Sequence, residues 1–241
     1  MKSLLLFVTQ LYSITLSCKE PIGKPVILQH GLFGSSSDWV ITEDGPYLDE
    51  IRQKNDSRRI IGNNLGFELA LAGYDVWLSN SRGNRYTDKK HRFRSISSAE
   101  YWDFSMEQKI DYDVPATIDY VLAKTGYKTV GWVGHSQGTM IMFGLLSTNR
   151  KYNEIIKPFI ALAPVSSIGN AKGPIRLFKN SIFNRLASTL RGKFGITSWF
   201  TRLFARNCPS NIKSLCANPL FMIVGSNAEQ FDHSRIEVYL R

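Results

Sequence analysis

Gly134-His135-Ser136-Gln137-Gly138 is the stretch that decides the fold of this chain. The apolar run at 128–133 precedes it and is typical of a buried strand, and the run at 139–146 follows it and is typical of a helix. A sharp strand-to-helix turn with serine at its centre is the pattern of a nucleophile elbow, which lifts the serine hydroxyl out of the backbone in a strained conformation. Side chains at 134 or 138 would collide with the neighbouring strand and helix, so glycine is expected at both. The sequence therefore predicts Ser136 as a nucleophile.

A second loop, upstream, predicts another part of the same site. The short strand at 25–28 is followed by the segment His30-Gly31-Leu32-Phe33-Gly34. A loop of this pattern can aim a backbone N–H group into the site. The N–H groups of Leu32 and Gln137 are therefore the predicted donors to the oxyanion of a tetrahedral intermediate, and one such donor is worth about 3 kcal/mol. We expect the His30 ring to make structural hydrogen bonds and not to act as a base.

The order of strand and helix patterns predicts the fold class. A chain of 241 residues can bury one sizeable core. Its strand candidates alternate with helical stretches at 65–72 and 112–122, and this alternation predicts a parallel sheet with helices on both faces. The strand candidates are 26–28, 75–78, 129–133 and 158–162. No apolar run approaches the roughly 18 residues that cross a bilayer, so no transmembrane span is expected.

The positive charge gathers in the last third of the chain. The formal net charge is +10, and residues 167–241 contain eleven Lys or Arg against three acidic residues. Phe and Leu alternate with these cations at helical spacing, which favours a basic amphipathic surface that meets anionic lipid or an acidic interface over a nucleic-acid site. A solvated helix face is the alternative that the sequence leaves open.

The sequence gives no support for a metal or a nucleotide. No Cys/His spacing suits zinc, and no glycine-rich phosphate loop is present, so no metal and no cofactor are expected. Of the three cysteines, Cys208 and Cys216 bracket a short segment, which suits either a small disulfide in an oxidising compartment or two free thiols.

The N-terminal segment allows two interpretations. Residues 1–17 resemble a secretory signal, but 12–16 also suit an edge strand of the sheet. The sequon Asn55-Asp56-Ser57 lies in a polar stretch, and glycosylation at Asn55 would agree with secretion.

The pattern changes after residue 165. The following region is helical and cationic, and its apolar stripe suits either a cap over the site or packing against the sheet. We therefore predict a possible signal segment or edge strand at 1–24, a catalytic core at 25–165 and an incomplete cap, or lid, at 166–241.

These motifs resemble the acid lipases, the group that contains gastric lipase and lysosomal acid lipase. The most specific similar stretch is 72–84, Ala-Gly-Tyr-Asp-Val-Trp-Leu-Ser-Asn-Ser-Arg-Gly-Asn. The other similar stretches are 28–32, 101–105, 134–138, 162–165 and 207–240. The resemblance implies an α/β-hydrolase fold, hydrolysis of neutral lipids such as triacylglycerol or cholesteryl ester at a lipid–water interface, no cofactor, secretion or lysosomal delivery, and a disulfide between Cys208 and Cys216.

The sequence departs from this family in its triad. Hydrolases of this fold order their triad as Ser, Asp and then His, and the sequence reaches Arg241 within the cap-like region, before the strands that carry the Asp and the His. We expect none of the four histidines to replace the base. His30 and His135 lie in the motif backbones, His91 in a charged loop and His233 in the cap-like region. Asp75 and Asp113 are likewise expected to be structural.

Two functions follow from this pattern. The first is a lipase in which Ser136 forms an acyl-enzyme that water, or another alcohol in an acyl transfer, then releases. The second is a truncated, catalytically inactive lipase-like protein that binds lipid, or an incomplete gene model, because serine without a base is a weak nucleophile.

Overall fold

The computed structural model describes residues 12–14, 23–32, 34–40, 64–84, 86–87, 99–167 and 169. The chain divides into two compact units, Met1–Ser167 and Ile168–Arg241, and nearly all of the described residues belong to the first. Several sequence predictions lie outside the described residues. They are the glycosylation at Asn55, the loop with His91, the pairing of Cys208 with Cys216, His233 and nearly all of the predicted cap at 166–241.

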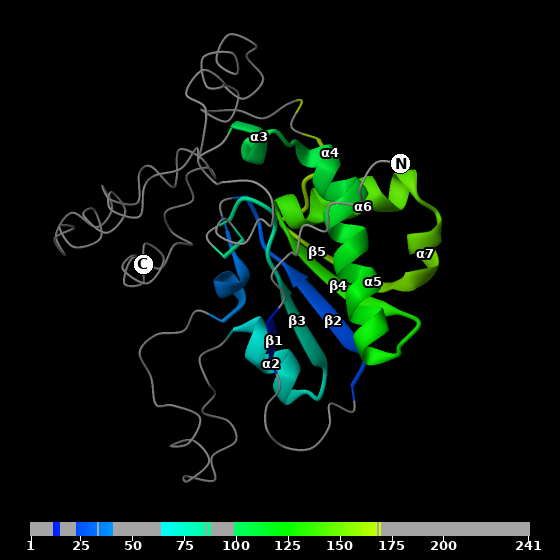
Figure 1. Ribbon diagram of the computed structural model, residues 1–241. Helices are drawn as coiled ribbons and strands as arrows, with labels where there is room; N and C mark the ends of the chain where they lie inside the picture. The colour runs from blue at the N-terminus through cyan, green and yellow to red at the C-terminus, as the bar shows by residue number, and fades with distance from the viewer. Residues whose placement is uncertain are drawn as a thin grey trace, which may run out of the picture. The chain divides into compact units, whose positions relative to one another are not determined.

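The centre of this unit is a five-stranded sheet with the order β1-β3-β2-β4-β5 (Figure 1). Strands β2, β3, β4 and β5 run parallel, and β1 pairs antiparallel with β3 at one edge. The strands span Tyr12–Ile14 (β1), Pro25–Gln29 (β2), Asp75–Ser79 (β3), Val130–His135 (β4) and Ile156–Leu162 (β5). The alternation of strands and helices in the sequence predicted this parallel α/β architecture, and the structure confirms it. Strand β1 lies within the N-terminal segment that the sequence allowed as either a signal or an edge strand.

Helices cover both faces of the sheet. The longer ones are α2 (Leu65–Leu71), α5 (Val114–Thr125) and α6 (Gln137–Thr148), and α7 (Lys151–Ile155) is shorter. The remaining segments are α3 (Ala99–Trp102), α4 (Met106–Gln108), the 3-10 helix η1 (Ser36–Trp39) and the π-helix η2 (Lys109–Asp113). In Figure 1, α5 and α6 lie on one side of the strands and α2 on the other.

Alternation along β2 divides the core into two layers. Ile27 points to a cluster that α5 and α6 complete, whereas Val26 and Leu28 belong to a cluster with Trp39 and α2. Side chains of a strand point alternately to its two faces, so a strand buried on both sides reads as a continuous apolar run. The five residues of β2 are all buried, which explains why no polar alternation marks this strand in the sequence.

Helix α5 shows how local sequence sets an element. Its buried residues Val114, Thr117, Ile118 and Val121 recur at the spacing of one helical face. Pro lies in the first turn, where a missing N–H is tolerated, and Gly126 ends the helix in the left-handed conformation with φ of 74°. The helix therefore packs one apolar stripe against the sheet and fixes the position of η2, which precedes it.

Candidate active site

The serine of the pentapeptide lies at a sharp bend between β4 and α6. Ser136 has φ of 50° and ψ of −110°, a region that residues other than glycine rarely adopt. Its side chain makes no capping hydrogen bond to α6 and is half-buried. Among the described residues, the Ser136 Oγ atom has no hydrogen-bond partner. Within the part of the chain that the structure describes, the local fold therefore presents a hydroxyl with no structural hydrogen bond.

Glycine is required at positions 134 and 138 because the backbone of neighbouring elements approaches both residues closely. A Cβ atom on Gly134 would lie 2.5 Å from the Gly138 carbonyl oxygen, and a Cβ atom on Gly138 would lie 2.5 Å from the Gln29 carbonyl oxygen. The first contact is with helix α6 and the second with strand β2. These are the collisions that the sequence predicted for side chains at 134 and 138.

Hydrogen bonds from three directions hold the strained bend. The Ser136 N–H donates to the Leu162 carbonyl at 3.0 Å, which joins the elbow to the end of β5. Thr139 Oγ1 donates to the Ser136 carbonyl at 2.7 Å and accepts from the Val165 N–H at 2.9 Å. The buried Trp132 indole donates to the Gly138 carbonyl at 3.3 Å. Strain persists only where the surroundings over-determine it, and these contacts do so.

The loop after β2 lies directly against the elbow. Strands β2 and β4 are neighbours, so both loops emerge at the carboxyl edge of the sheet, where ligands bind in open α/β folds. A Cβ atom on Gly31 would lie 3.3 Å from Ser136 Cβ and 3.0 Å from His135 Nδ1. Within the described part of the chain, the Leu32 and Gln137 N–H groups have no acceptor. The structure thus brings Ser136, Leu32 and Gln137 to one edge of the sheet.

The hydrogen bonds of His30 identify its neutral tautomer. The Ser81 N–H donates to His30 Nε2 at 3.0 Å, so Nε2 is an acceptor, and Nδ1 must carry the proton that it donates to the Gly31 carbonyl at 2.7 Å. Asn84 Nδ2 lies 3.3 Å from the same Nε2 atom. The ring is 3% exposed, and burial lowers the pKa of His30 from 6.5 to about 4. His30 is a structural group under the loop, as its position in the motif predicted.

The stability of the fold is expected to depend on pH through His30. Because the folded state holds the ring neutral, its contribution is fully present above pH 6.5 and is lost as the pH falls from 6.5 toward about 4. At pH 4.5 the loss is about 2.5 kcal/mol relative to pH 7. Urea unfolding of the wild type and of His30→Gln at both pH values measures it. We expect the difference between the two pH values to be about 2.5 kcal/mol smaller in the variant; equal differences would mean that another group titrates.

Polar residues that follow β3 form hydrogen bonds that hold the loop after β2 in place. Asn80 Oδ1 accepts from the Ser36 N–H at 2.9 Å and from Asn84 Nδ2 at 2.7 Å. Gln29 Nε2 donates to Ser81 Oγ at 3.1 Å. Asn80 is fully buried, and Ser79, Ser81 and Arg82 beside it are also buried. The segment 79–84, part of the most specific similarity in the sequence, therefore fixes the loop that carries Leu32.

The two aspartates that the sequence assigned to structural roles make hydrogen bonds to residues other than Ser136. Asp113 accepts two hydrogen bonds from Arg82 Nε, at 3.0 Å and 2.8 Å, and Asp75 accepts from the Trp77 indole at 2.8 Å. His135 is exposed and adjacent to Ser136 in the chain. Neither of the two described histidines makes a hydrogen bond to Ser136 Oγ. In the described ranges, no cluster of His, Cys, Asp or Glu could hold a metal ion, and no helix is long and apolar enough to cross a membrane.

Comparisons with known proteins agree with this geometry. A family model described as alpha/beta hydrolase fold matches residues 24–202. Gastric triacylglycerol lipase from Bos taurus is 38% identical over 229 residues, covering 90% of this chain and 51% of the lipase. Lysosomal acid lipase/cholesteryl ester hydrolase from Homo sapiens is 37% identical, with coverage of 90% and 51%. The chain spans about half the length of these relatives.

A solved structure shows the same fold. A putative lipase from Sulfolobus solfataricus superposes with a TM-score of 0.56 at 13% identity, covering 95% of this chain and 69% of that chain. At this identity the likeness concerns the fold alone.

Proposed function

Because this chain belongs to the α/β-hydrolase fold family, we propose that it acts as a serine ester hydrolase on neutral lipids, with Ser136 as the nucleophile. The observation that carries this proposal is the strained conformation of Ser136, whose hydroxyl has no hydrogen-bond partner among the described residues, beside the loop of Gly31 and Leu32. The similarity to gastric triacylglycerol lipase and to lysosomal acid lipase/cholesteryl ester hydrolase supports the class of substrate.

In the proposed reaction, Ser136 Oγ attacks the carbonyl carbon of the ester while a base takes its proton. The N–H groups of Leu32 and Gln137 then stabilise the tetrahedral oxyanion, which collapses to an acyl-enzyme and releases the alcohol. Water attacks the acyl-enzyme, and the fatty acid leaves. Hydrolases of this fold carry the acid and the base of the triad after the serine in chain order. The sequence predicts neither residue within 1–241.

Apolar side chains at the same edge of the sheet favour a substrate with an apolar acyl chain. Leu32 is 46% exposed in the loop after β2, and Leu162 is 38% exposed at the end of β5. The Leu162 carbonyl bonds the Ser136 N–H, so this leucine is a direct neighbour of the elbow. Exposed leucines flanking a nucleophile favour contact with hydrocarbon over contact with a charged substrate. Secretion or lysosomal delivery, glycosylation at Asn55 and the disulfide of Cys208 with Cys216 belong to the same proposal.

A fluorophosphonate probe tests the proposal on the purified chain. The probe reacts preferentially with an activated serine, and we expect tandem mass spectrometry to find the phosphonate on Ser136. Release of oleate from triolein or cholesteryl oleate then tests the substrate class. Folded protein that stays unlabelled, or that is labelled on another residue, would contradict hydrolysis through Ser136.

A second candidate function is lipid binding without turnover. It is favoured by one observation: within the described part of the chain, no base is hydrogen-bonded to Ser136 Oγ. In that case the chain would bind a fluorescent neutral lipid, remain unlabelled by the probe and release no fatty acid. The same two assays therefore separate the candidates.

A further inference from the structure

A lysine lies beside the elbow in a place that the motifs do not explain. Lys109 is the first residue of η2, and its side chain is half-buried. Its Nζ atom donates to Gln137 Oε1 at 2.9 Å and lies 5.9 Å from the centre of the Phe104 ring. Among the described residues, no carboxylate lies within ion-pair distance of this ammonium group. A partly buried lysine that bonds a neutral amide is uncommon, because burial without a counter-charge costs free energy.

Three local features place Lys109 there. Ser105 and Gln108 form a capping box that starts α4 immediately before η2. Segment 109–113 is then wound as a π-helix, a form that is frequent at functional sites. Gly144 of α6 leaves room for Ile110, because a Cβ atom there would lie 3.0 Å from Ile110 Cγ1. Helix α6 therefore approaches η2 closely enough for Gln137, its first residue, to meet Lys109.

We propose that Lys109 is a positioning residue for the oxyanion site. Its ammonium group holds the side chain of Gln137 and places a positive charge next to the residue whose N–H is the proposed oxyanion donor. The N–H groups in the first turn of a helix have no intrahelical acceptor, so fixing the first residue of α6 fixes one of these donors. The catalytic consequence rests on the proposed function, whereas the coupling between Lys109 and Gln137 does not.

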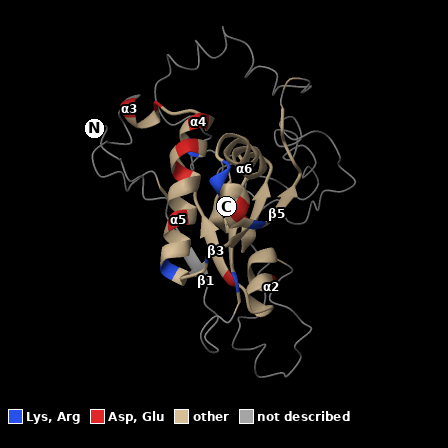
Figure 2. Cartoon of the chain, turned by 90° about the vertical axis from the view of Figure 1, so that its right-hand side faces the viewer, with Lys and Arg blue, Asp and Glu red and all other residues tan. Residues whose placement is uncertain are grey.

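The charges around Lys109 make the effect of its ammonium group on Gln137 dependent on pH. Burial is the main reason that the pKa of Lys109 is lowered to about 8; Asp113 acts in the opposite direction, and Arg82 makes a smaller contribution that lowers the pKa. His30 is neutral in this range, α6 has no ionisable side chain, and Glu107 of α4 is exposed. Figure 2 marks in red the positions of the acidic residues along α4 and α5. Because a lysine is charged below its pKa, the full positive charge at Gln137 is present below about pH 8 and is lost above it.

Kinetics of Lys109 variants test the catalytic consequence. Direct removal of an oxyanion donor costs about 10²–10³-fold, so loss of a group that acts through Gln137 should cost less. We expect Lys109→Met to lower the rate of fluorophosphonate labelling about tenfold below pH 8. Lys109→Arg should keep the rate and remove its decline above pH 8, because arginine stays charged. Lys124→Met is the matched control, since Lys124 lies over the Tyr120 ring at 5.7 Å and is exposed.

Nuclear magnetic resonance tests the coupling without any activity. In protein labelled with ¹⁵N-glutamine, the backbone amide of Gln137 should titrate with a midpoint near 8 in the wild type and in Lys124→Met. It should not titrate in Lys109→Arg. An amide of Gln137 that does not respond to pH around 8 in the wild type would overturn the inference, whether or not Ser136 reacts. A normal titration in unreactive protein would keep the inference and contradict the proposed function. Equal labelling rates and pH profiles in wild type and Lys109→Met would overturn its catalytic part.

Discussion

Replacement of Ser136 by alanine is expected to abolish ester hydrolysis; where a base activates the serine, the loss is on the order of 10⁶-fold in kcat. The loss is large because the remaining oxyanion donors and substrate contacts supply only a small part of catalysis when the nucleophile is absent. The measurement is the initial rate with a short-chain p-nitrophenyl ester at neutral pH. Unchanged hydrolysis by the folded variant would remove Ser136 from the mechanism.

Replacement of Ser136 by glycine distinguishes the loss of the hydroxyl group from the relief of backbone strain. Ser136→Gly removes the hydroxyl, as alanine does, but glycine accepts φ of 50° without the steric cost of a Cβ atom. A residue in such a region stores about 1–3 kcal/mol, against about 0.5–1 kcal/mol of added chain entropy for glycine. We therefore expect Ser136→Gly to be as inactive as Ser136→Ala and more stable than it by about 1 kcal/mol in urea unfolding. Equal stabilities would mean that the bend stores no more strain than the roughly 0.5–1 kcal/mol of chain entropy that glycine adds.

The elbow and the strands were predictable because their signals are local. An apolar run, a glycine pair and a serine lie within a dozen residues, and the collisions that demand Gly134 and Gly138 follow from the turn itself. Helix α5 was placed from its own periodicity, although it begins at Val114 and not at the expected position 112. The two residues before it belong to η2, and a π-helix leaves no distinct hydrophobic period in a sequence.

The polar supports of the site were not predictable because their partners are distant in sequence. Asn80 bonds the Ser36 N–H across 44 residues, and Asn84 reaches the His30 ring across 54. A short polar residue between strands normally indicates a solvated loop. Lys109 was missed for the same reason, since an isolated lysine is usually exposed and its contact with Gln137 spans 28 residues. Thr139 and Trp132 were read as helix and strand residues, and only the structure shows that they hold the elbow.

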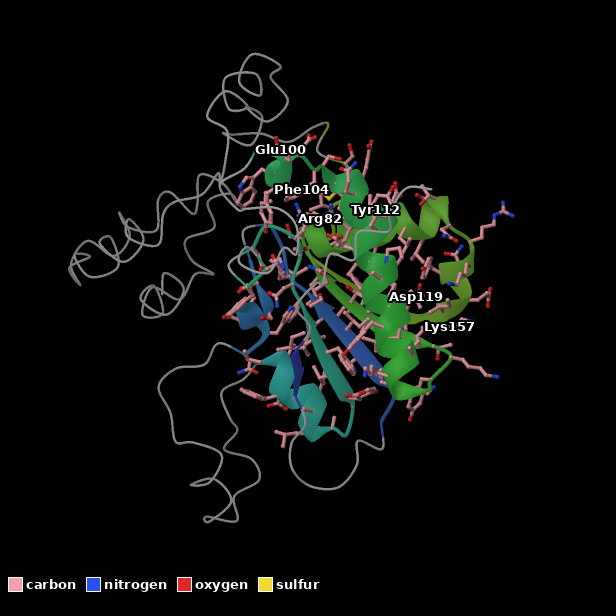
Figure 3. All side chains as sticks on the ribbon, viewed as in Figure 1. Arg82, Glu100, Phe104, Tyr112, Asp119 and Lys157 are labelled. Atoms are coloured by element: carbon pink, nitrogen blue, oxygen red, sulfur yellow. The ribbon has the colours of Figure 1, made fainter. Side chains whose placement is uncertain are left out.

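The largest effect on stability is expected from Asp113. Arg82 Nε donates to both oxygens of this carboxylate at 3.0 Å and 2.8 Å, and the Arg82 Nη2 group also donates to it. Both side chains are 5% exposed, and Arg82 lies 5.5 Å from the centre of the Phe104 ring (Figure 3). Removal of one partner of a buried, hydrogen-bonded ion pair is strongly destabilising because the other charge stays buried without that partner. Asp113→Ala should therefore lower the free energy of unfolding by about 3–5 kcal/mol.

Asp119→Ala is the control for this prediction. Asp119 lies in the helix that follows Asp113, and its contact with Lys151 is 3.6 Å long with both side chains more than half exposed. An exposed pair of this kind contributes at most about 1 kcal/mol. Urea unfolding of both variants, with an unchanged slope, measures the two losses directly. Because the pair ties the segment after β3 to η2, we expect Asp113→Ala also to disturb the contact of Lys109 with Gln137. A loss no larger than that of Asp119→Ala would mean that solvent reaches the carboxylate and that η2 is held by its packing against α6.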